Sequence, residues 1–83
     1  MTIAGNTISH WLKFFLDAGI PASQAAGYAV SFLENRIQPE MLADLDKEYL
    51  KEMGITVMGD IIAVLKHARK TAEEVNGSPI YKG

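Results

Sequence analysis

Apolar residues recur along this chain at the spacing of helical faces, and glycine and proline divide them into short segments. The first predicted helix covers the sequence TISHWLKFFLDAG, in which Thr7 or Ser9 can cap the free N–H groups of the first turn. Gly19 is placed to end this helix. The residues on its predicted buried face are Trp11, Leu12, Phe15 and Leu16.

A second helix is predicted over PASQAAGYAVSFLEN, beginning at Pro21 or Ser23. Gly27 lies inside it and costs about 1 kcal/mol relative to alanine. Close approach of a neighbouring helix would be a reason for glycine at this position. The predicted buried face consists of Ala25, Tyr28, Ala29, Phe32 and Leu33.

Two shorter helices are predicted next, over QPEMLADL and KEYLKEM. Pro39 suits a first helical position, where its missing N–H is not needed. Asp46 can cap the second of these helices, and Gly54 can end it in a left-handed conformation. Their apolar residues are Met41, Leu42 and Leu45, followed by Tyr49, Leu50 and Met53.

The longest helix is predicted from about Met58 to Val75. Its apolar stripe consists of Ile61, Val64, Leu65, Ala68, Ala72 and Val75, with Met58 and Ile62 widening it on one side. No stretch alternates apolar and polar residues for long enough to form a strand. The pattern therefore predicts an all-α fold, with four short helices followed by a longer one.

Composition limits the size and the class of this domain. The 83 residues suffice for one domain, which we place at residues 8–75, between flexible tails at 1–7 and 76–83. Such tails are expected of a domain excised from a longer protein. Eight Lys and Arg stand against ten Asp and Glu, so the formal charge is −2, which argues against nucleic-acid binding. There is no cysteine, and no apolar run approaches the roughly 18 residues of a membrane span.

Residues that carry catalytic chemistry are few and scattered. His10 and His67 have no cysteine partner and are expected to be solvated. Gly54 and Gly59 do not form a phosphate loop, because no strand precedes them and no Lys-Ser/Thr pair follows. An acidic group near one helix start is explained by capping and solvation, and it comprises Asp44, Asp46, Glu48 and Glu52. We therefore expect no enzyme activity, no metal and no cofactor.

The order of several short segments resembles that of a sterile alpha motif (SAM) domain. These segments are WL at 11–12, YAVSFLENRI at 28–37, LADL at 42–45, DKEYLKEMGI at 46–55 and MGDIIAVL at 58–65. The series runs from about residue 8 to 72, and its last two segments are the most specific. The chain looks closest to a little-characterised group of animal SAM proteins that share FF-x-x-AGIP and GDIIA-x-LKHA.

The resemblance implies a five-helix bundle with a long C-terminal helix, acting as a protein–protein interaction module. SAM domains commonly join head to tail through two unlike surfaces. The first is the end-helix surface at the start of the last helix, which here corresponds to Val57, Met58, Gly59, Asp60 and Lys66. The second is the mid-loop surface, which is often acidic and here corresponds to Glu40, Asp44, Asp46 and Glu48.

Two features of the end-helix surface are left open by the residues themselves. Met58 either serves as an exposed anchor for a partner or closes the end of the core, as methionine often does. Asp60 places a negative charge where an acidic surface would have to dock, which leaves apolar contact as the main attraction.

The resemblance implies protein partners, either a second copy of this chain or another SAM domain. The alternative is RNA hairpin binding by the start of the last helix, but Asp60 and Ile61 stand where Arg or Lys would be needed. Membrane-surface binding lacks a basic face. An intracellular location is expected, and the related animal group favours the nucleus over the cytoplasm.

Overall fold

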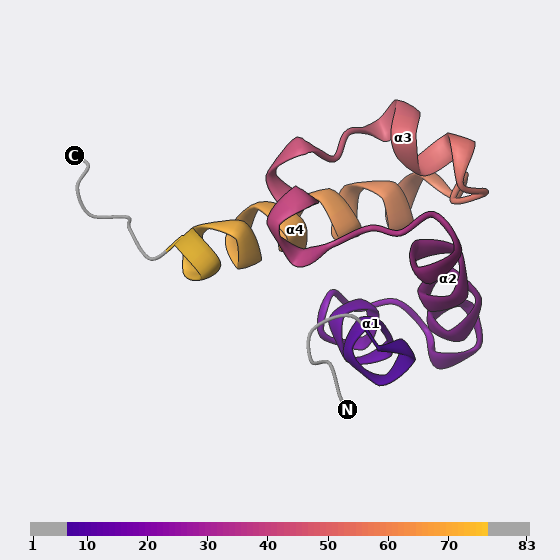
Figure 1. Ribbon diagram of the computed structural model, residues 1–83. Helices are drawn as coiled ribbons and strands as arrows, with labels where there is room; N and C mark the ends of the chain where they lie inside the picture. Colours follow the sequence, from indigo (N-terminus) through magenta and orange to yellow (C-terminus); the bar gives the residue numbers. More distant parts are fainter. Residues whose placement is uncertain (1–6, 77–83) are drawn as a thin grey trace.

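The computed structural model describes residues 7–76, which form five helices and no strand (Figure 1). They are α1 (Ile8–Asp17), α2 (Ala22–Glu34), the 3₁₀ helix η1 (Pro39–Asp44), α3 (Lys47–Glu52) and α4 (Met58–Asn76). The predicted all-α, five-helix fold with a long last helix is confirmed. The predicted tails fall outside the described residues except at their inner ends, where Thr7 caps α1 and α4 continues to Asn76.

Side-chain caps begin two of the helices as the sequence indicates. The Thr7 hydroxyl accepts a hydrogen bond from the His10 N–H at 3.1 Å, so Thr7 rather than Ser9 is the cap of α1. The Asp46 carboxylate accepts from the Tyr49 N–H at 3.0 Å and caps α3. Each cap satisfies an N–H group that the first helical turn leaves without a partner.

The ends of α1, α2 and α3 share one hydrogen-bonding motif. In each, the residue after the C-cap is left-handed: Gly19 at φ 99°, Arg36 at φ 57° and Gly54 at φ 90°. An isoleucine follows each of these residues and donates its N–H back into the last turn. The bonds run from Ile20 to Phe15 at 3.0 Å, from Ile37 to Phe32 at 2.9 Å and from Ile55 to Leu50 at 2.9 Å. This is the Schellman arrangement, which reverses the chain and brings an apolar residue back against the helix it has left.

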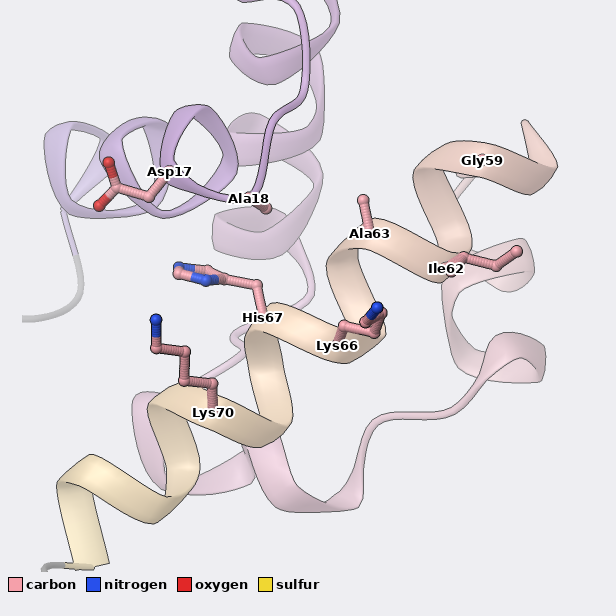
Figure 2. A pocket seen from close by; sticks show the side chains of 8 residues that line it. All are labelled: Asp17, Ala18, Gly59, Ile62, Ala63, Lys66, His67 and Lys70. Atoms are coloured by element: carbon pink, nitrogen blue, oxygen red, sulfur yellow. The ribbon is translucent and has the colours of Figure 1, made fainter.

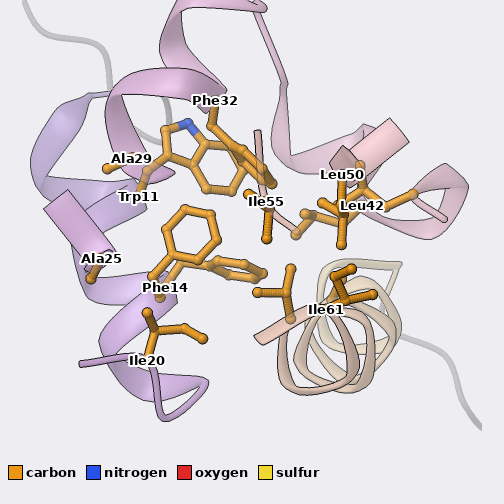
Figure 3. Close-up of a cluster of buried hydrophobic side chains, with 14 of the residues drawn as sticks. Trp11, Phe14, Ile20, Ala25, Ala29, Phe32, Leu42, Leu50, Ile55 and Ile61 are labelled. Carbon is orange, nitrogen blue, oxygen red and sulfur yellow. The ribbon is translucent and has the colours of Figure 1, made fainter. Parts of the chain in front are cut away.

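The core is built around aromatic side chains of the first two helices. The Trp11 ring meets Phe14 and Phe32 edge to face, with centroids 5.4 and 5.0 Å apart. Residues of α3 and of the segments before and inside α4 close the other side (Figure 3). The buried set is Trp11, Phe14, Phe15, Ile20, Ala25, Ala29, Phe32, Leu42, Leu45, Leu50, Ile55, Ile61, Val64, Ala68 and Ala72.

The helices associate in two groups that this core joins. α1 packs mainly against α2, whereas α4 packs mainly against η1 and, to a smaller extent, α3. Figure 1 shows α4 lying across the molecule, with α3 on one side and the pair α1–α2 on the other. The start of α4 therefore lies close to α2 of one group and α3 of the other.

Several predicted burial assignments are wrong. Phe14 is buried although it was not assigned to the apolar face, whereas Leu16, Met41, Tyr49 and Ile62 are exposed. The short helices carry more apolar residues than one buried face can hold, so some must face outward. The histidines are half-buried rather than solvated: His10 meets Trp11 at 4.9 Å and His67 meets Phe14 at 4.8 Å between ring centroids.

The expected close approach at Gly27 is also absent. Gly27 is exposed, and no atom of a neighbouring element lies within 4 Å of where a β-carbon would be. Its conformation is helical, so nothing in the fold requires glycine there.

Two glycine-to-alanine changes should therefore have opposite effects on stability. Gly54→Ala is expected to lower the free energy of unfolding by about 1–2 kcal/mol, because alanine disfavours positive φ. Gly27→Ala is expected to raise it by about 0.5–1 kcal/mol, because the helix interior disfavours glycine. Arg36→Gly should also stabilise, by removing a side chain from a left-handed position. Urea denaturation measures all three, and equal effects at Gly27 and Gly54 would contradict this account.

Candidate protein interface

The start of α4 exposes a group of apolar side chains. Met58 is 69% exposed, Val57 56% and Ile62 53%. Met58 therefore does not close the core, and its role as an anchor for a partner stays a prediction. Ile62 lies one turn after Met58 on the same side of the helix and was not among the predicted site residues. We use "end-helix surface" for Val57, Met58, Gly59, Asp60, Ile62 and Lys66.

A groove of about 550 Å³ continues this surface between α4 and the end of α1 (Figure 2). It is lined by Asp17, Ala18, Gly59, Ile62, Ala63, Lys66, His67 and Lys70. Figure 2 shows the side chains of His67 and Lys70 extending from α4 toward the end of α1. The one carboxylate in the lining, that of Asp17, is paired with the Lys13 ammonium group at 3.0 Å. The groove is therefore predominantly basic.

A second groove, of about 340 Å³, lies over η1, α3 and the end of α2. We call it the mid-loop groove, and it is lined by Asn35, Ile37, Met41, Asp44, Leu45, Tyr49, Glu52 and Met53. Most of these side chains are apolar, and two carboxylates stand among them. Tyr49 is its most exposed apolar member, at 56%.

The predicted acidic residues are only partly united by this groove. Asp44 lines it, whereas Glu40, Asp46 and Glu48 are exposed on the same short helices without lining it. The apolar lining residues were missed, because their helical spacing assigned Met41, Tyr49 and Met53 to the core. The sequence did hold one indication of their exposure. The two six-residue helices and their ends carry more apolar residues than so short a helix can turn toward the core.

The middle of α4 and the segment of η1 and α3 carry opposite charge, whereas the end-helix surface itself holds one acid, Asp60, and one base, Lys66. From Ile61 to Ala72, every ionisable side chain is basic: Lys66, His67, Arg69 and Lys70. From Pro39 to Glu52, two lysines are outnumbered by the acids Glu40, Asp44, Asp46, Glu48 and Glu52. The Lys13–Asp17 pair is the single ion pair among residues 7–76, so these charges are not neutralised by close pairing within the described domain.

The Asp60 carboxylate at the start of α4 is held by a hydrogen bond from another helix. The Tyr28 hydroxyl, on α2, donates a hydrogen bond to the Asp60 carboxylate, and both side chains are half-buried. Burial, followed by this hydrogen bond and the negative charge of Asp60, raises the pKa of Tyr28 to about 12. The pair joins α2 to the first turn of α4.

The described part of the chain lacks the features of a metal site and of a membrane span. Residues 7–76 contain no group of three His, Cys, Asp or Glu side chains placed to hold a metal ion. None of their helices combines the length and apolarity needed to cross a membrane. The Trp11 indole N–H is buried without a hydrogen-bond partner, and it borders neither groove.

Fold and surface together define a small helical domain with two exposed grooves of unlike character. The sequence profile of the SAM domain (sterile alpha motif) matches residues 1–75. The chain therefore belongs to the SAM domain family, whose members are generally non-catalytic protein-interaction modules.

Among individual proteins, the chain is similar to two that are each named actin cytoskeleton-regulatory complex protein SLA1. It is 42% identical over 60 residues to the one from Mycosarcoma maydis and 33% identical over 60 residues to the one from Vanderwaltozyma polyspora. Each similarity covers 72% of this chain but spans only 5% of the relative. No solved structure matches the chain significantly.

The Tyr28–Asp60 contact predicts a specific ionisation behaviour. In the folded protein Tyr28 should lose its proton near pH 12, whereas a free tyrosine does so near 10. The stability linked to the raised pKa of Tyr28, which comes first from burial and then from this contact, is therefore complete below about pH 10 and lost as the pH rises through about 12.

Ultraviolet absorbance of tyrosinate measures this pKa in a variant whose other two tyrosines are changed to phenylalanine. Asp60→Asn should move the midpoint toward 10 without restoring it completely, because burial of the phenol persists. A midpoint unaffected by Asp60→Asn would contradict the assigned cause.

Proposed function

We propose that this SAM domain joins copies of itself head to tail, with the end-helix surface of one copy docking in the mid-loop groove of the next. The observation that carries the proposal is the exposure of Val57, Met58 and Ile62 beside each other at the start of α4. An apolar groove of suitable size lies on a different part of the same molecule. The domain thus offers both halves of an apolar contact.

The charges around the two surfaces support the same arrangement. Met58 and Ile62 supply the apolar part of the end-helix surface, and Lys66 lies about 12 Å further along α4 than Met58. We expect Lys66 to meet Asp44 or Glu52, which line the mid-loop groove, when Met58 occupies that groove. The N–H groups of the first turn of α4 add partial positive charge on the same side.

Joining two unlike surfaces has a consequence for assembly. Such a contact is heterologous, so each added copy leaves one free surface of each kind. The product is a ring or an open helical filament instead of a closed dimer. Pairing with another SAM domain uses the same two surfaces and is the alternative for a chain that does not bind itself.

We also propose a cellular role and location for the protein that contains this domain. The name of the fungal relatives favours a non-catalytic scaffolding role in assemblies linked to the actin cytoskeleton. Such a role agrees with an intracellular location and favours the cytoplasm over the nucleus. The closer similarity to an animal group sharing FF-x-x-AGIP and GDIIA-x-LKHA stays a prediction.

Replacing the most exposed apolar side chain should abolish self-association without unfolding the domain. Met58→Glu puts a charge into the apolar contact and opposite Asp44 and Glu52, so we expect association at least about tenfold weaker. Val30→Glu is the matched control, because Val30 is also exposed but lines neither groove. Size-exclusion chromatography with light scattering over a range of concentrations measures both. A wild-type protein that stays strictly monomeric would refute self-association and leave pairing with another SAM domain.

RNA binding is the competing function, and the structure offers it less support. The basic residues Lys66, Arg69 and Lys70 lie beyond the first turns of α4, where Asp60 and the buried Ile61 stand. A gel-shift assay with pooled RNA hairpins at moderate salt is expected to show no complex. A complex that weakens steeply with added salt would reverse this ranking.

A further inference from the structure

The end-helix surface contains a charge that opposes the docking proposed for it. Asp60 is two residues from Met58, and the mid-loop groove that would receive Met58 carries the carboxylates of Asp44 and Glu52. Exposed charges interact appreciably within about 8 Å at physiological ionic strength. Asp60 and Met58 project from different sides of α4, so we expect this repulsion only from an Asp60 carboxylate that turns toward the groove of the next copy.

Tyr28 is placed to prevent this. Its half-buried ring packs against the fully buried Phe15, with centroids 5.6 Å apart, so the phenol is held in position. Its hydroxyl donates to the Asp60 carboxylate. Within residues 7–76 this is the one hydrogen bond between side chains more than four residues apart.

We propose that Tyr28 is a positioning residue of the end-helix surface, which holds the Asp60 carboxylate against α2 and away from an acidic docking partner. This inference depends on the proposed head-to-tail contact. The residue acts through Asp60 and needs no contact with the partner. It explains how an end-helix surface with an acid in its first turn can dock in a groove that is itself acidic.

The proposal makes the effect of Tyr28 depend on the charge of Asp60. In Tyr28→Phe the ring still fills its place against Phe15, but the carboxylate loses its donor and turns toward solvent. Docking should then weaken through repulsion. Removing the charge as well, in Tyr28→Phe/Asp60→Asn, should restore docking, although the hydrogen bond stays lost.

Two variants, each with one of the two docking surfaces removed, allow the contact to be measured as a single heterodimer. A Met58→Glu copy retains only the mid-loop groove, and a Tyr49→Lys copy retains only the end-helix surface, because Tyr49 lines the groove. Neither copy should associate with itself, whereas the mixture should form a one-to-one complex. Isothermal titration calorimetry gives its Kd, and circular dichroism melts confirm that each variant is folded.

Tyr28→Phe in the Tyr49→Lys copy should raise the Kd about two- to fivefold, the size of effect that a single exposed charge interaction has. The same change in the Met58→Glu copy should leave the Kd unaltered, because that copy does not use its end-helix surface. Adding Asp60→Asn to the weakened copy should return the Kd to its starting value. In about 1 M salt, where screening acts over roughly 3 Å, the loss should largely disappear.

The outcomes distinguish a failure of the proposed role of Tyr28 from a failure of the proposed head-to-tail contact. Absence of any complex between the Met58→Glu and Tyr49→Lys copies refutes head-to-tail docking itself. A normal complex that Tyr28→Phe weakens equally in either copy shows a merely structural role for Tyr28, and failure of Asp60→Asn to rescue does the same. Should Tyr28→Phe not fold, Asp60→Asn alone in the Tyr49→Lys copy decides the matter: an unchanged or tighter Kd is expected, and a weaker one overturns the proposal.

Discussion

The packing of α1 against α2 through their aromatic side chains is the interaction on which this domain depends. Helices of 6 to 13 residues are not stable alone in water, so α1, α2 and α3 exist because they bury surface together. Trp11, Phe15 and Phe32 are completely buried. The Phe32 ring meets Trp11 and Phe15 edge to face, with ring centroids 5.0 and 4.8 Å apart. Deleting one such ring typically costs about 3–5 kcal/mol, a large share of the roughly 5–15 kcal/mol that holds a domain folded.

The Schellman turns extend this packing into the rest of the chain. Each returns an isoleucine to the helix that it follows, and two of the three, Ile20 and Ile55, are buried in the same core. The chain therefore reverses sharply three times within about 36 residues, from Ile20 to Ile55, while still adding apolar surface to one cluster. α4 is then held along its Ile61–Val64–Ala68 stripe, which leaves the opposite side of its first turns exposed.

That exposure connects the fold to its function. A helix start fixed by the core presents Met58 and Ile62 in a constant geometry, and the same packing places the mid-loop groove on α3 and η1. A rigid pair of surfaces loses little conformational freedom on docking, which favours association between small domains. In the head-to-tail contact that we propose, the basic side of α4 faces the acidic side of η1 and α3. The Tyr28–Asp60 contact ties the first turn of α4 to α2.

The residue pattern was sufficient for the helices, for the cap at Asp46 and for the helix ends at Gly19 and Gly54, because these depend on neighbours within a few positions. It left the cap of α1 open between Thr7 and Ser9, and the structure shows Thr7. The pattern was also sufficient to identify the family, because the order of the short segments can be recognised in the sequence without knowledge of contacts. It did not reveal which apolar residues face outward. Helical spacing places Met41 and Tyr49 on one face with Leu42 and Leu50, and only the direction from which the other helices approach separates them. The role of Asp60 was likewise decided by tertiary structure, because its partner Tyr28 lies 32 residues earlier and is brought to it by the packing of α2 near the start of α4.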